Sequence, residues 1–354
     1  MNSGTMGKPF GRYGSSEMLN WKNKNVFITG ADGFIGGWLA KKLVEKEANV
    51  ILLVRDIKKQ SVYKLFNLEE KVTQVQGDLV NYSLLERILN EYSVDCCFHL
   101  AAQALVQIAN RSPLSTFESN IKGTWELLEA CRNTKSIEIV IVASSDKAYG
   151  VQQKLPYNEE SPLLGIYPYD VSKACADILS RSYFVSYGLT VAVTRNANTY
   201  GGGDLNFSRI IPDAIRCILL EKEFVIRSDG TPERDFMYVE DPVSGYIALA
   251  ENIEREDVRG EAFNFGTGKP VNVINLFNKI AQLCGKPDIE PKILGKAKNE
   301  IDRQYLAIGK AKEILKWEPR YTIEQGLKET IEWYKSYFNL NKDNNHAPKG
   351  KTTK

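Results

Sequence analysis

Short apolar runs alternate with helical patterns through the first half of the chain. Apolar runs rich in β-branched residues predict strands at 25–29, 49–54, 95–99, 137–143 and 189–194. Apolar residues at helical spacing predict helices between them, at 34–47, 81–92, 114–133 and 169–187. Apolar strands that are separated by helices form a parallel sheet covered on both faces. The pattern therefore predicts an α/β fold with a doubly wound parallel sheet.

This regular alternation ends after Arg195. Glycines and prolines interrupt the pattern at Gly201–Gly203, Pro212, Gly230 and Pro232. A strand is predicted at 262–265, and helices at 241–251, 273–283, 310–315 and 323–337. We expect a first domain from 18–195 with a returning segment at about 236–266. A smaller α/β lobe from 196–235 and 267–338 would bind the substrate, between a flexible leader (1–17) and a disordered tail (339–354).

The charge of the chain excludes several classes of protein. Of the net charge of +2, the segments 1–17 and 341–354 carry +4, which leaves −2 on 18–340. A nearly neutral body argues against nucleic-acid binding. No apolar run reaches the roughly 18 residues of a membrane span, and 1–17 lack the apolar region of a signal peptide. Six cysteines without C-x-x-C spacing fit a reduced cytoplasm.

Histidines are too few for several kinds of catalysis. The chain has only His99 and His346, and the second lies in the polar tail. This excludes a multi-histidine metal site, and a histidine-based nucleophile triad would depend on His99, which ends an apolar strand. We predict no metal site, so Tyr, Lys, Ser, Asp or a cofactor must carry the chemistry.

A glycine-rich turn follows the first predicted strand and opens the first helix. Gly30, Gly33 and Gly36 have the spacing G-x-x-G-x-x-G, which allows a tight turn, a close approach to a pyrophosphate and close packing of helix on sheet. The helix N-terminus then supplies N–H donors to the phosphates. This is the fingerprint of a Rossmann dinucleotide site, although a glycine-rich turn without a ligand is the alternative.

Acidic residues near the ends of the next strands select the cofactor. Asp56 lies twenty residues after Gly36, where an acid accepts from ribose hydroxyls and repels a 2′-phosphate. Arg55 directly before it suits NADP, so NAD is favoured and NADP is less favoured. Asp78 and Leu79 could touch the adenine, or could form a helix-capping turn. Further residues of the predicted cofactor turn are Asp32, Phe34 and Ile35.

Tyr169 and Lys173 form a Tyr-x-x-x-Lys pair on a predicted helix. At this spacing the two side chains share one face, where a cation lowers the pKa of a phenol. Tyr169 could then take a proton from a sugar hydroxyl while hydride passes to a nicotinamide, and Lys173 could hold its ribose. The pattern alone is common on solvated helices. It gains weight from the strand that ends in Ser144-Ser145 about 25 residues earlier.

With these motifs the chain resembles the extended short-chain dehydrogenase/reductase family over roughly 22–338. The residues that carry the resemblance are Thr29–Gly36, His99–Ala102, Asn120, Ser144–Gly150, Tyr169, Lys173, Asn198, Arg234-Asp235 and Val239-x-Asp241. The resemblance implies NAD(P) and a nucleotide-diphosphate sugar. It also implies cofactor contacts at Leu100, Ala101, Ala102 and Gln103. A homodimer through helices 114–133 and 169–187 is implied, with a tetramer left open.

The segment Ser145-Asp146-Lys147 resembles the S-D-K segment of CDP-glucose 4,6-dehydratases. Gly201–Asp204 and Arg209–Asp213 resemble the same subfamily. Leu205 and Ile35 depart from it, because tryptophan and lysine are expected there. The nucleotide base therefore stays open: the substrate could be CDP-glucose, GDP-mannose or a UDP-sugar. The expected reaction is NAD-dependent dehydration of a nucleotide hexose to its 4-keto-6-deoxy form, by a lyase.

The resemblance gives each of these residues a role. Asp146 would be the acid for the leaving 6-hydroxyl and Lys147 the base at C5, unless Lys147 only neutralises Asp146 or binds phosphate. Ser145 would bond the 4-oxygen and position Tyr169, or would only satisfy backbone.

Other polar residues would hold the substrate or support the site. Residues expected at the sugar diphosphate are Asn198, Arg209, Arg234 and Arg303, although Arg303 could simply pair with Asp302. Asp235 would brace Arg234, and Asn120 would be a structural or water-relay residue. A 4-epimerase and a non-catalytic NAD-sensing protein are the alternatives.

Overall fold

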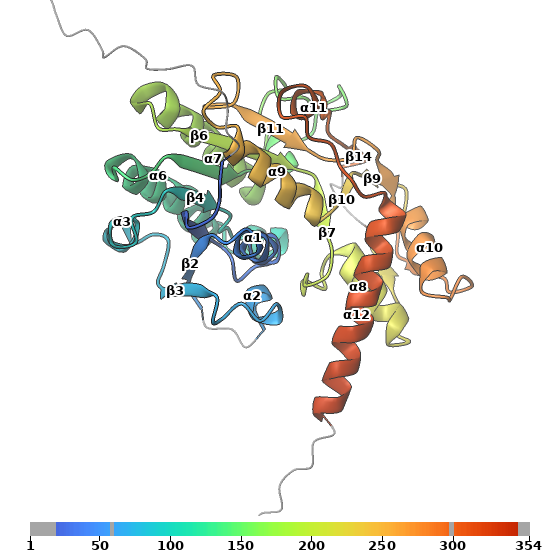
Figure 1. Cartoon of the computed structure of the whole chain (residues 1–354). Helices are drawn as coiled ribbons and strands as arrows, with labels where there is room; N and C mark the ends of the chain where they lie inside the picture. Colours follow the sequence, from blue (N-terminus) through green and yellow to red (C-terminus); the bar gives the residue numbers. More distant parts are fainter. Residues whose placement is uncertain (1–18, 57–59, 297–300, 346–354) are drawn as a thin grey trace, which may run out of the picture.

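The computed structural model describes residues 19–56, 60–296 and 301–345, the last six by their backbone alone. Its centre is a parallel sheet with the strand order β11-β6-β5-β4-β1-β2-β3 (Figure 1). The strands are β1 Asn25–Thr29, β2 Asn49–Val54, β3 Val72–Gln76, β4 Cys96–His99, β5 Ile139–Ala143, β6 Val191–Asn196 and β11 Ala262–Phe265. This confirms the predicted doubly wound α/β fold, since the order 3-2-1-4-5-6 is that of dinucleotide-binding sheets.

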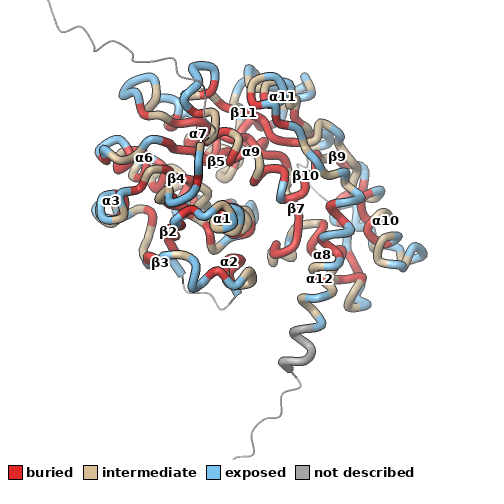
Figure 2. The backbone as a smooth tube through the Cα atoms, viewed as in Figure 1, coloured by how far each residue is buried: buried red, intermediate tan, exposed pale blue. Residues whose placement is uncertain are grey.

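Helices cover both faces of the sheet. Those of the first half are α1 Phe34–Glu45, α2 Val62–Leu65, α3 Tyr82–Glu91, α4 Val106–Arg111, α5 Pro113–Phe117, α6 Gly123–Asn133 and α7 Pro168–Tyr187. In β1, Val26 and Ile28 belong to the core under α1, while Phe27 belongs to the core under α3 and α6. Because successive side chains point to opposite faces, the central strands are buried on both sides (Figure 2).

The predicted helix 114–133 is not continuous. It consists of α5, a π-helical turn at Glu118–Lys122 and α6. Asn120 lies in this π turn and is only 2% exposed. Its amide bonds both the N–H and the carbonyl of Gln103, and also the Ser172 hydroxyl. Single π-helical turns occur frequently at functional sites, and this one contains the residue that makes these three contacts.

The second half of the chain adds small sheets and helices beside the large sheet (Figure 1). The strand pairs are β7 Asn198–Tyr200 with β10 Phe236–Tyr238, and β8 Val225–Ile226 with β13 Lys292–Ile293. In a third small sheet, β9 Glu233–Arg234 lies between β12 Val271–Asn272 and β14 Arg303–Gln304. The helices are α8 Ile210–Leu219, α9 Glu240–Glu251, α10 Val273–Leu283, α11 Gly309–Ile314 and α12 Ile323–Asn345.

Two expectations for this half need correction. Pro212 lies in the first turn of α8, where its missing N–H costs no helix bond, so it does not interrupt a helix. Helix α12 continues to Asn345, so the predicted disorder from 339 onward is wrong for 339–345. The leader 1–17 and residues 346–354 lie outside the described residues. Within the described ranges, no helix combines the length and apolar character needed to cross a membrane.

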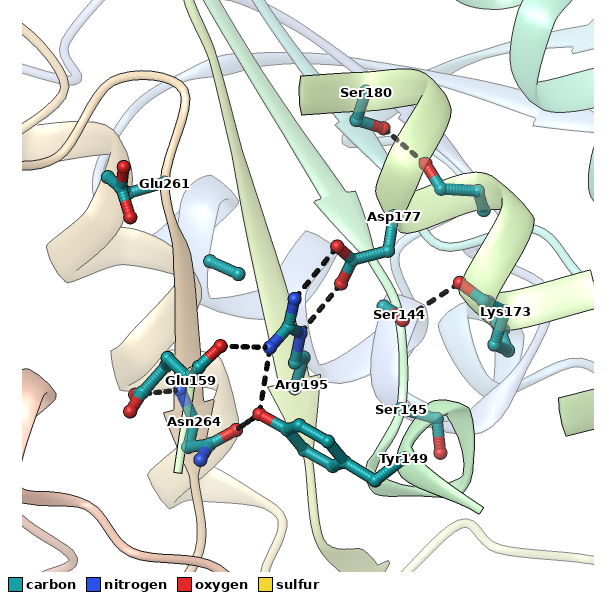
Figure 3. A network of polar contacts seen from close by, with 12 residues as sticks. Ser144, Ser145, Tyr149, Glu159, Lys173, Asp177, Ser180, Arg195, Glu261 and Asn264 are labelled. Atoms are coloured by element: carbon teal, nitrogen blue, oxygen red, sulfur yellow. Dashed lines mark hydrogen bonds and ion pairs between the residues drawn. The ribbon is translucent and has the colours of Figure 1, made fainter. Parts of the chain in front are cut away.

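A buried ion pair ties several elements together (Figure 3). The Arg195 guanidinium, on β6, donates to both carboxylate oxygens of Asp177 on α7, at 2.7 and 2.9 Å. The same guanidinium donates to the Tyr149 hydroxyl at 2.9 Å and to the Glu159 carbonyl at 3.1 Å. Tyr149 in turn donates to Asn264 on β11 at 2.7 Å. Arg195 is 1% exposed and Asp177 is fully buried, so each charge depends on the other.

We predict that Asp177→Asn lowers the free energy of unfolding by about 3–5 kcal/mol, because it leaves the Arg195 charge buried without its carboxylate. Urea unfolding monitored by circular dichroism measures the change. Glu318→Gln, which removes the exposed Lys312–Glu318 pair, is the control and should leave the urea midpoint unchanged. Equal midpoints for the two variants would show that the buried pair contributes nothing.

Candidate active site

A cavity of about 860 Å³ opens at the carboxyl ends of the parallel strands. Its lining includes every residue predicted to contact the cofactor: Gly30, Asp32, Gly33, Phe34, Ile35, Gly36, Arg55, Asp56, Asp78, Leu79, Leu100, Ala101, Ala102 and Gln103, with Tyr169 and Lys173. The predicted catalytic and substrate residues that line the same cavity are Ser145, Asp146, Lys147, Asn198, Arg209 and Arg234. The strands thus bring together residues more than 200 positions apart.

The glycine turn fits a pyrophosphate. Gly30 has φ +79°, and a Cβ there would lie 2.6 Å from the Ala101 nitrogen. A Cβ on Gly36 would collide with the Gly30 carbonyl, as expected for close packing of helix on strand. Gly33 caps α1 without a side-chain hydrogen bond. The first-turn N–H groups and the positive end of the α1 dipole therefore face a site suited to an anion.

The two residues that predict opposite cofactors pair with each other. The Arg55 Nε and Nη2 atoms both lie 3.0 Å from Asp56 Oδ2, and both side chains are more than half exposed. Both residues line the cavity beyond the end of β2. The carboxylate thus stands where a ribose would be recognised, and the guanidinium is held beside it.

A buried polar chain supports the loop after β4. The Thr124 hydroxyl donates to the Asn120 carbonyl, so it accepts from His99 Nε2 at 2.9 Å. The other ring nitrogen then accepts from the Thr29 hydroxyl at 2.8 Å. Burial lowers the pKa of His99 to about 3, which keeps the ring neutral. Asn120 accepts from the Gln103 N–H at 2.7 Å, so these buried hydrogen bonds hold the loop after β4 in place.

Tyr169 and Lys173 lie together on α7, but their electrostatics differ from the prediction. Lys173 Nζ donates to the Ala143 carbonyl at 2.7 Å, and burial lowers its pKa to about 8. Burial raises the pKa of Tyr169 to about 12, while the Ser145 hydroxyl and the Arg209 charge act in the opposite direction. The expected lowering of the phenol pKa by Lys173 is therefore not what the structure shows, because the ammonium faces a carbonyl.

Ser145, Asp146 and Lys147 form the start of a short 3-10 turn, Asp146–Tyr149, directly after β5. The Ser145 hydroxyl caps this turn by accepting from the Lys147 N–H at 3.2 Å, and it donates to Asp146 Oδ1 at 3.1 Å. Lys147 Nζ lies 3.5 Å from Asp146 Oδ2. Asp146 is 2% exposed, so an acid and an amine stand side by side at the cavity wall. The Tyr149 end of the turn is held by the Arg195 network (Figure 3).

Polar side chains line the opposite part of the cavity. Arg209 forms an ion pair of 2.9 Å with Asp204, whose side chain is 2% exposed. Asn198 Nδ2 donates to the Asp235 carbonyl at 3.2 Å, and Arg234 Nη1 donates to the Glu233 carbonyl at 2.9 Å. Cationic and amide groups of this kind suit a diphosphate.

The structure does not bring Arg303 to the cavity. The Arg303 guanidinium bonds Glu233 at 2.6 Å and is 52% exposed, so it pairs with Glu233 instead of Asp302. The strand alternation on β14 explains this placement, because the next residue, Gln304, is the buried one. Asp235 does not brace Arg234 either. Its carboxylate accepts from the backbone N–H groups of Thr267 and Gly268.

Several neighbours of the site carry no signal in the sequence. Gln304 is fully buried and contacts both Lys147 and Asp146 from the far end of the chain. Asp170 is 5% exposed, and burial raises its pKa to about 6, with Lys147 and Asp146 as its charged neighbours. The sequence offered one clue to Asp170, its position directly after Tyr169. Other unpredicted lining residues include Ser119, Asn196, Thr199, Asn206, Ser208, Phe236 and Tyr246.

The fold and the cavity define a dinucleotide-binding protein of the doubly wound class. The family described as GDP-mannose 4,6 dehydratase matches residues 27–330. The chain is 30% identical to the CDP-glucose 4,6-dehydratase of Salmonella typhimurium over 90% of this chain and 92% of that protein. The chain therefore belongs to the GDP-mannose 4,6-dehydratase family, which confirms the resemblance found in its motifs.

Two solved structures cover nearly the same range. The UDP-glucose 4-epimerase of Thermotoga maritima, solved with UDP-glucose, superposes with a TM-score of 0.81 at 31% identity, over 89% of this chain and 99% of that one. The dTDP-glucose 4,6-dehydratase of Bacillus anthracis, solved in complex with NAD, gives a TM-score of 0.78 at 27% identity, over 88% and 97%. The fold is thus shared by dehydratases and epimerases, and side chains must distinguish them.

We predict that Asp170→Asn stabilises the protein at neutral pH. Its folded pKa of about 6 lies above the ordinary 3.8, so the buried carboxylate is unfavourable above pH 6 and the penalty disappears below about pH 4. The substitution should raise the free energy of unfolding by up to about 3 kcal/mol at pH 7.5 and by far less at pH 4.

Urea unfolding at both pH values measures this gain, with Asp288→Asn at an exposed position as the control. A gain of the same size at the two pH values would contradict the assignment to ionisation.

Proposed function

We propose that this protein is an NAD-dependent nucleotide-sugar 4,6-dehydratase, a hydro-lyase that makes a 4-keto-6-deoxyhexose nucleotide. The observation that carries the proposal is the Asp146–Lys147 pair, 3.5 Å apart on the turn after β5. The pair shares one cavity with Tyr169 and the glycine turn. A reaction that only removes hydride from one carbon and returns it there requires Tyr169 and the glycine turn. The additional acid and base therefore point to elimination.

Each step of the elimination has a residue to perform it. Tyr169, bonded by Ser145, receives the proton of the 4-hydroxyl. The glycine turn, Asp56 and Lys173 would hold NAD, which when bound would supply the acceptor for hydride from C4 and its donor to C6. Its positive charge would favour the Tyr169 phenolate. The 4-keto group acidifies the C5 proton, which Lys147 removes as a neutral amine, and Asp146 protonates the leaving 6-hydroxyl as water. Lys147 then returns a proton to C5 as hydride reaches C6. An epimerase has no proton to remove at C5 and no water to release.

The remaining polar residues hold the substrate. Arg209, Arg234 and Asn198 are the groups we assign to the diphosphate, and Arg303 is omitted because it pairs with Glu233. Cytidine is our first choice of base, supported by the Salmonella typhimurium relative. GDP-mannose and UDP-sugars are alternatives, because Leu205 and Ile35 depart from that subfamily. A non-catalytic NAD sensor would have no use for the acid–base pair.

A sugar panel tests the activity. The protein with NAD is incubated with CDP-glucose, GDP-mannose, UDP-glucose and UDP-GlcNAc, and the keto sugar is detected by its absorbance in alkali. We expect water loss with one sugar. Inversion at C4 without water loss would establish an epimerase instead, and no reaction across the panel would count against the dehydratase.

We predict that Asp146→Asn keeps NAD binding but slows water loss by about 10²-fold or more, because an amide cannot supply the proton to the 6-hydroxyl. Mass spectrometry of the product and calorimetry of NAD binding measure the two effects. Asp257→Asn, at an exposed Arg255 pair, is the control and should behave as wild type. Formation of the deoxy sugar by Asp146→Asn at the wild-type rate would refute the acid role.

We predict that Asp56→Ser weakens NAD binding about 10-fold or more and improves NADP binding, because the carboxylate that accepts from ribose and repels a phosphate is gone. Arg55, released from its 3.0 Å pair, can then meet the 2′-phosphate. Calorimetric titration with each cofactor measures the preference. The double variant with Arg55→Met should lose the gained NADP affinity. If Asp56→Ser left the preference for NAD unchanged, Asp56 would not be the discriminating residue.

We also propose a cytoplasmic homodimer through α5–α6 and α7, with a tetramer as the alternative. Large apolar side chains stand exposed on these helices: Leu114, Trp125, Ile178 and Val185. Such side chains along neighbouring helices suit a helical interface. All six cysteines are free, which supports a reducing compartment. In this assembly 18–195 with 236–266 would bind NAD, and 196–235 with 267–338 would bind the sugar.

A further inference from the structure

Gln304 reaches the acid–base pair from the far end of the chain. It lies on β14, is fully buried, and uses both ends of its side-chain amide on the turn after β5. Its Oε1 accepts from Lys147 Nζ, and its Nε2 donates to the Asp146 carbonyl at 3.0 Å. One side chain from the last small sheet thus bonds both members of the pair.

The orientation of this amide follows from its two neighbours. The Lys147 ammonium has only donors, so it must face the amide oxygen. The Asp146 carbonyl only accepts, so it must face the amide nitrogen. In the opposite orientation the amide nitrogen would face the Lys147 ammonium, donor against donor. The amide oxygen would face the Asp146 carbonyl, acceptor against acceptor. Each unsatisfied group is costly inside the protein. Lys147 and the Asp146 backbone therefore fix Gln304, and Gln304 in turn fixes them.

The backbone of Gln304 is held independently of the turn. Strand β14 pairs in parallel with β9, with Gln304 opposite Arg234 in the register. The Asp235 N–H donates to the Gln304 carbonyl at 3.2 Å, and the Tyr157 N–H donates to the Tyr305 carbonyl at 3.1 Å. The amide is thus presented to Lys147 by a rigid strand pair that also carries Arg234, a cavity-lining residue.

The charges around Lys147 explain the use of a neutral partner. The Asp146 carboxylate lies 3.5 Å from Lys147 on the same turn. Asp170, on α7, interacts electrostatically with Lys147 and Asp146, and Asp235, directly after β9, interacts electrostatically with Asp146. A carboxylate in place of Gln304 would add another negative charge to this group. An amide oxygen can hold the ammonium in place without that charge.

We propose that Gln304 is a positioning residue that holds the Lys147 side-chain nitrogen beside Asp146. Its consequence for turnover rests on the proposed dehydratase, whereas its effect on Lys147 does not. Removing the amide oxygen should make the ammonium form less favourable and the side chain less confined. Replacing the amide by a carboxylate should make the ammonium form more favourable.

The first test reads Lys147 directly, without substrate. Competitive labelling of lysines with acetic anhydride between pH 6 and 11, followed by mass spectrometry of the Lys147 peptide, gives the pH of half-maximal reactivity. We expect Gln304→Met to move this midpoint down by roughly 0.5–1 pH unit and Gln304→Glu to move it up by about 1 or more. Thr330→Val is the matched control, because it removes a buried hydrogen bond of α12 to the Gly326 carbonyl and should leave the midpoint in place.

The same variants separate positioning from a merely structural role. With the sugar that the wild type dehydrates, Gln304→Met should lower kcat roughly 10-fold or more with KM within about 3-fold, because the C5 step and not binding is affected. Gln304→Glu should shift the acidic limb of the kcat profile to higher pH. Thr330→Val should lose thermal stability as the Gln304 variants do, but it should change neither kcat nor the pH profile of kcat.

The outcomes are distinguishable from those of the function itself. If the labelling midpoint of Lys147 is the same in wild type and in the folded Gln304 variants, the positioning role is wrong, whether or not the enzyme dehydrates a sugar. If Gln304→Met does not fold, the near-isosteric Gln304→Glu decides by the same measurement. If the midpoints move as expected but the wild type dehydrates no sugar, the positioning role of Gln304 is supported and the proposed dehydratase reaction is wrong.

Discussion

Parallel pairing of the central strands is the constraint on which the site depends. Because β1, β2, β4, β5 and β6 run in the same direction, their carboxyl ends meet at one edge of the sheet. The glycine turn, Asp56, the loop after His99 and the turn after Ala143 each follow one of these ends. Residues with no sequence proximity therefore share a cavity.

Charged side chains in the cavity are compensated by nearby ion partners, or their pKa values are shifted by burial. The body of the chain is almost neutral, and its cavity contains arginines, aspartates and lysines that are compensated nearby. Arg209 pairs with the buried Asp204, and Lys147 pairs with the buried Asp146. Burial lowers the pKa of Lys173 to about 8, and it is the largest cause that raises the pKa of Tyr169 to about 12. The site thus combines proton donors and acceptors of shifted pKa with a body of small net charge.

The sequence predicted those features that depend on local pattern. Strands at 25–29, 49–54 and 262–265 coincide with β1, β2 and β11, because apolar runs bounded by turns define buried strands locally. The cofactor residues line the cavity as expected, since the glycine spacing and strand ends fix them relative to a helix N-terminus. The π turn at 118–122 could not be predicted, because its Asn120 contacts Gln103 and Ser172, which are distant along the chain.

The placement of Arg303 away from the cavity has a physical cause in the pairing of β14. Arg303 and Gln304 are neighbours of similar polarity, and only the register of β14 against β9 decides which one faces the protein interior. The local S-D-K motif places Asp146 and Lys147 on one turn, whereas Gln304, which bonds both residues, comes from a strand much later in the chain. Family members that share this sheet include both dehydratases and epimerases. The difference between the two chemistries must therefore lie in side chains and not in the shared fold.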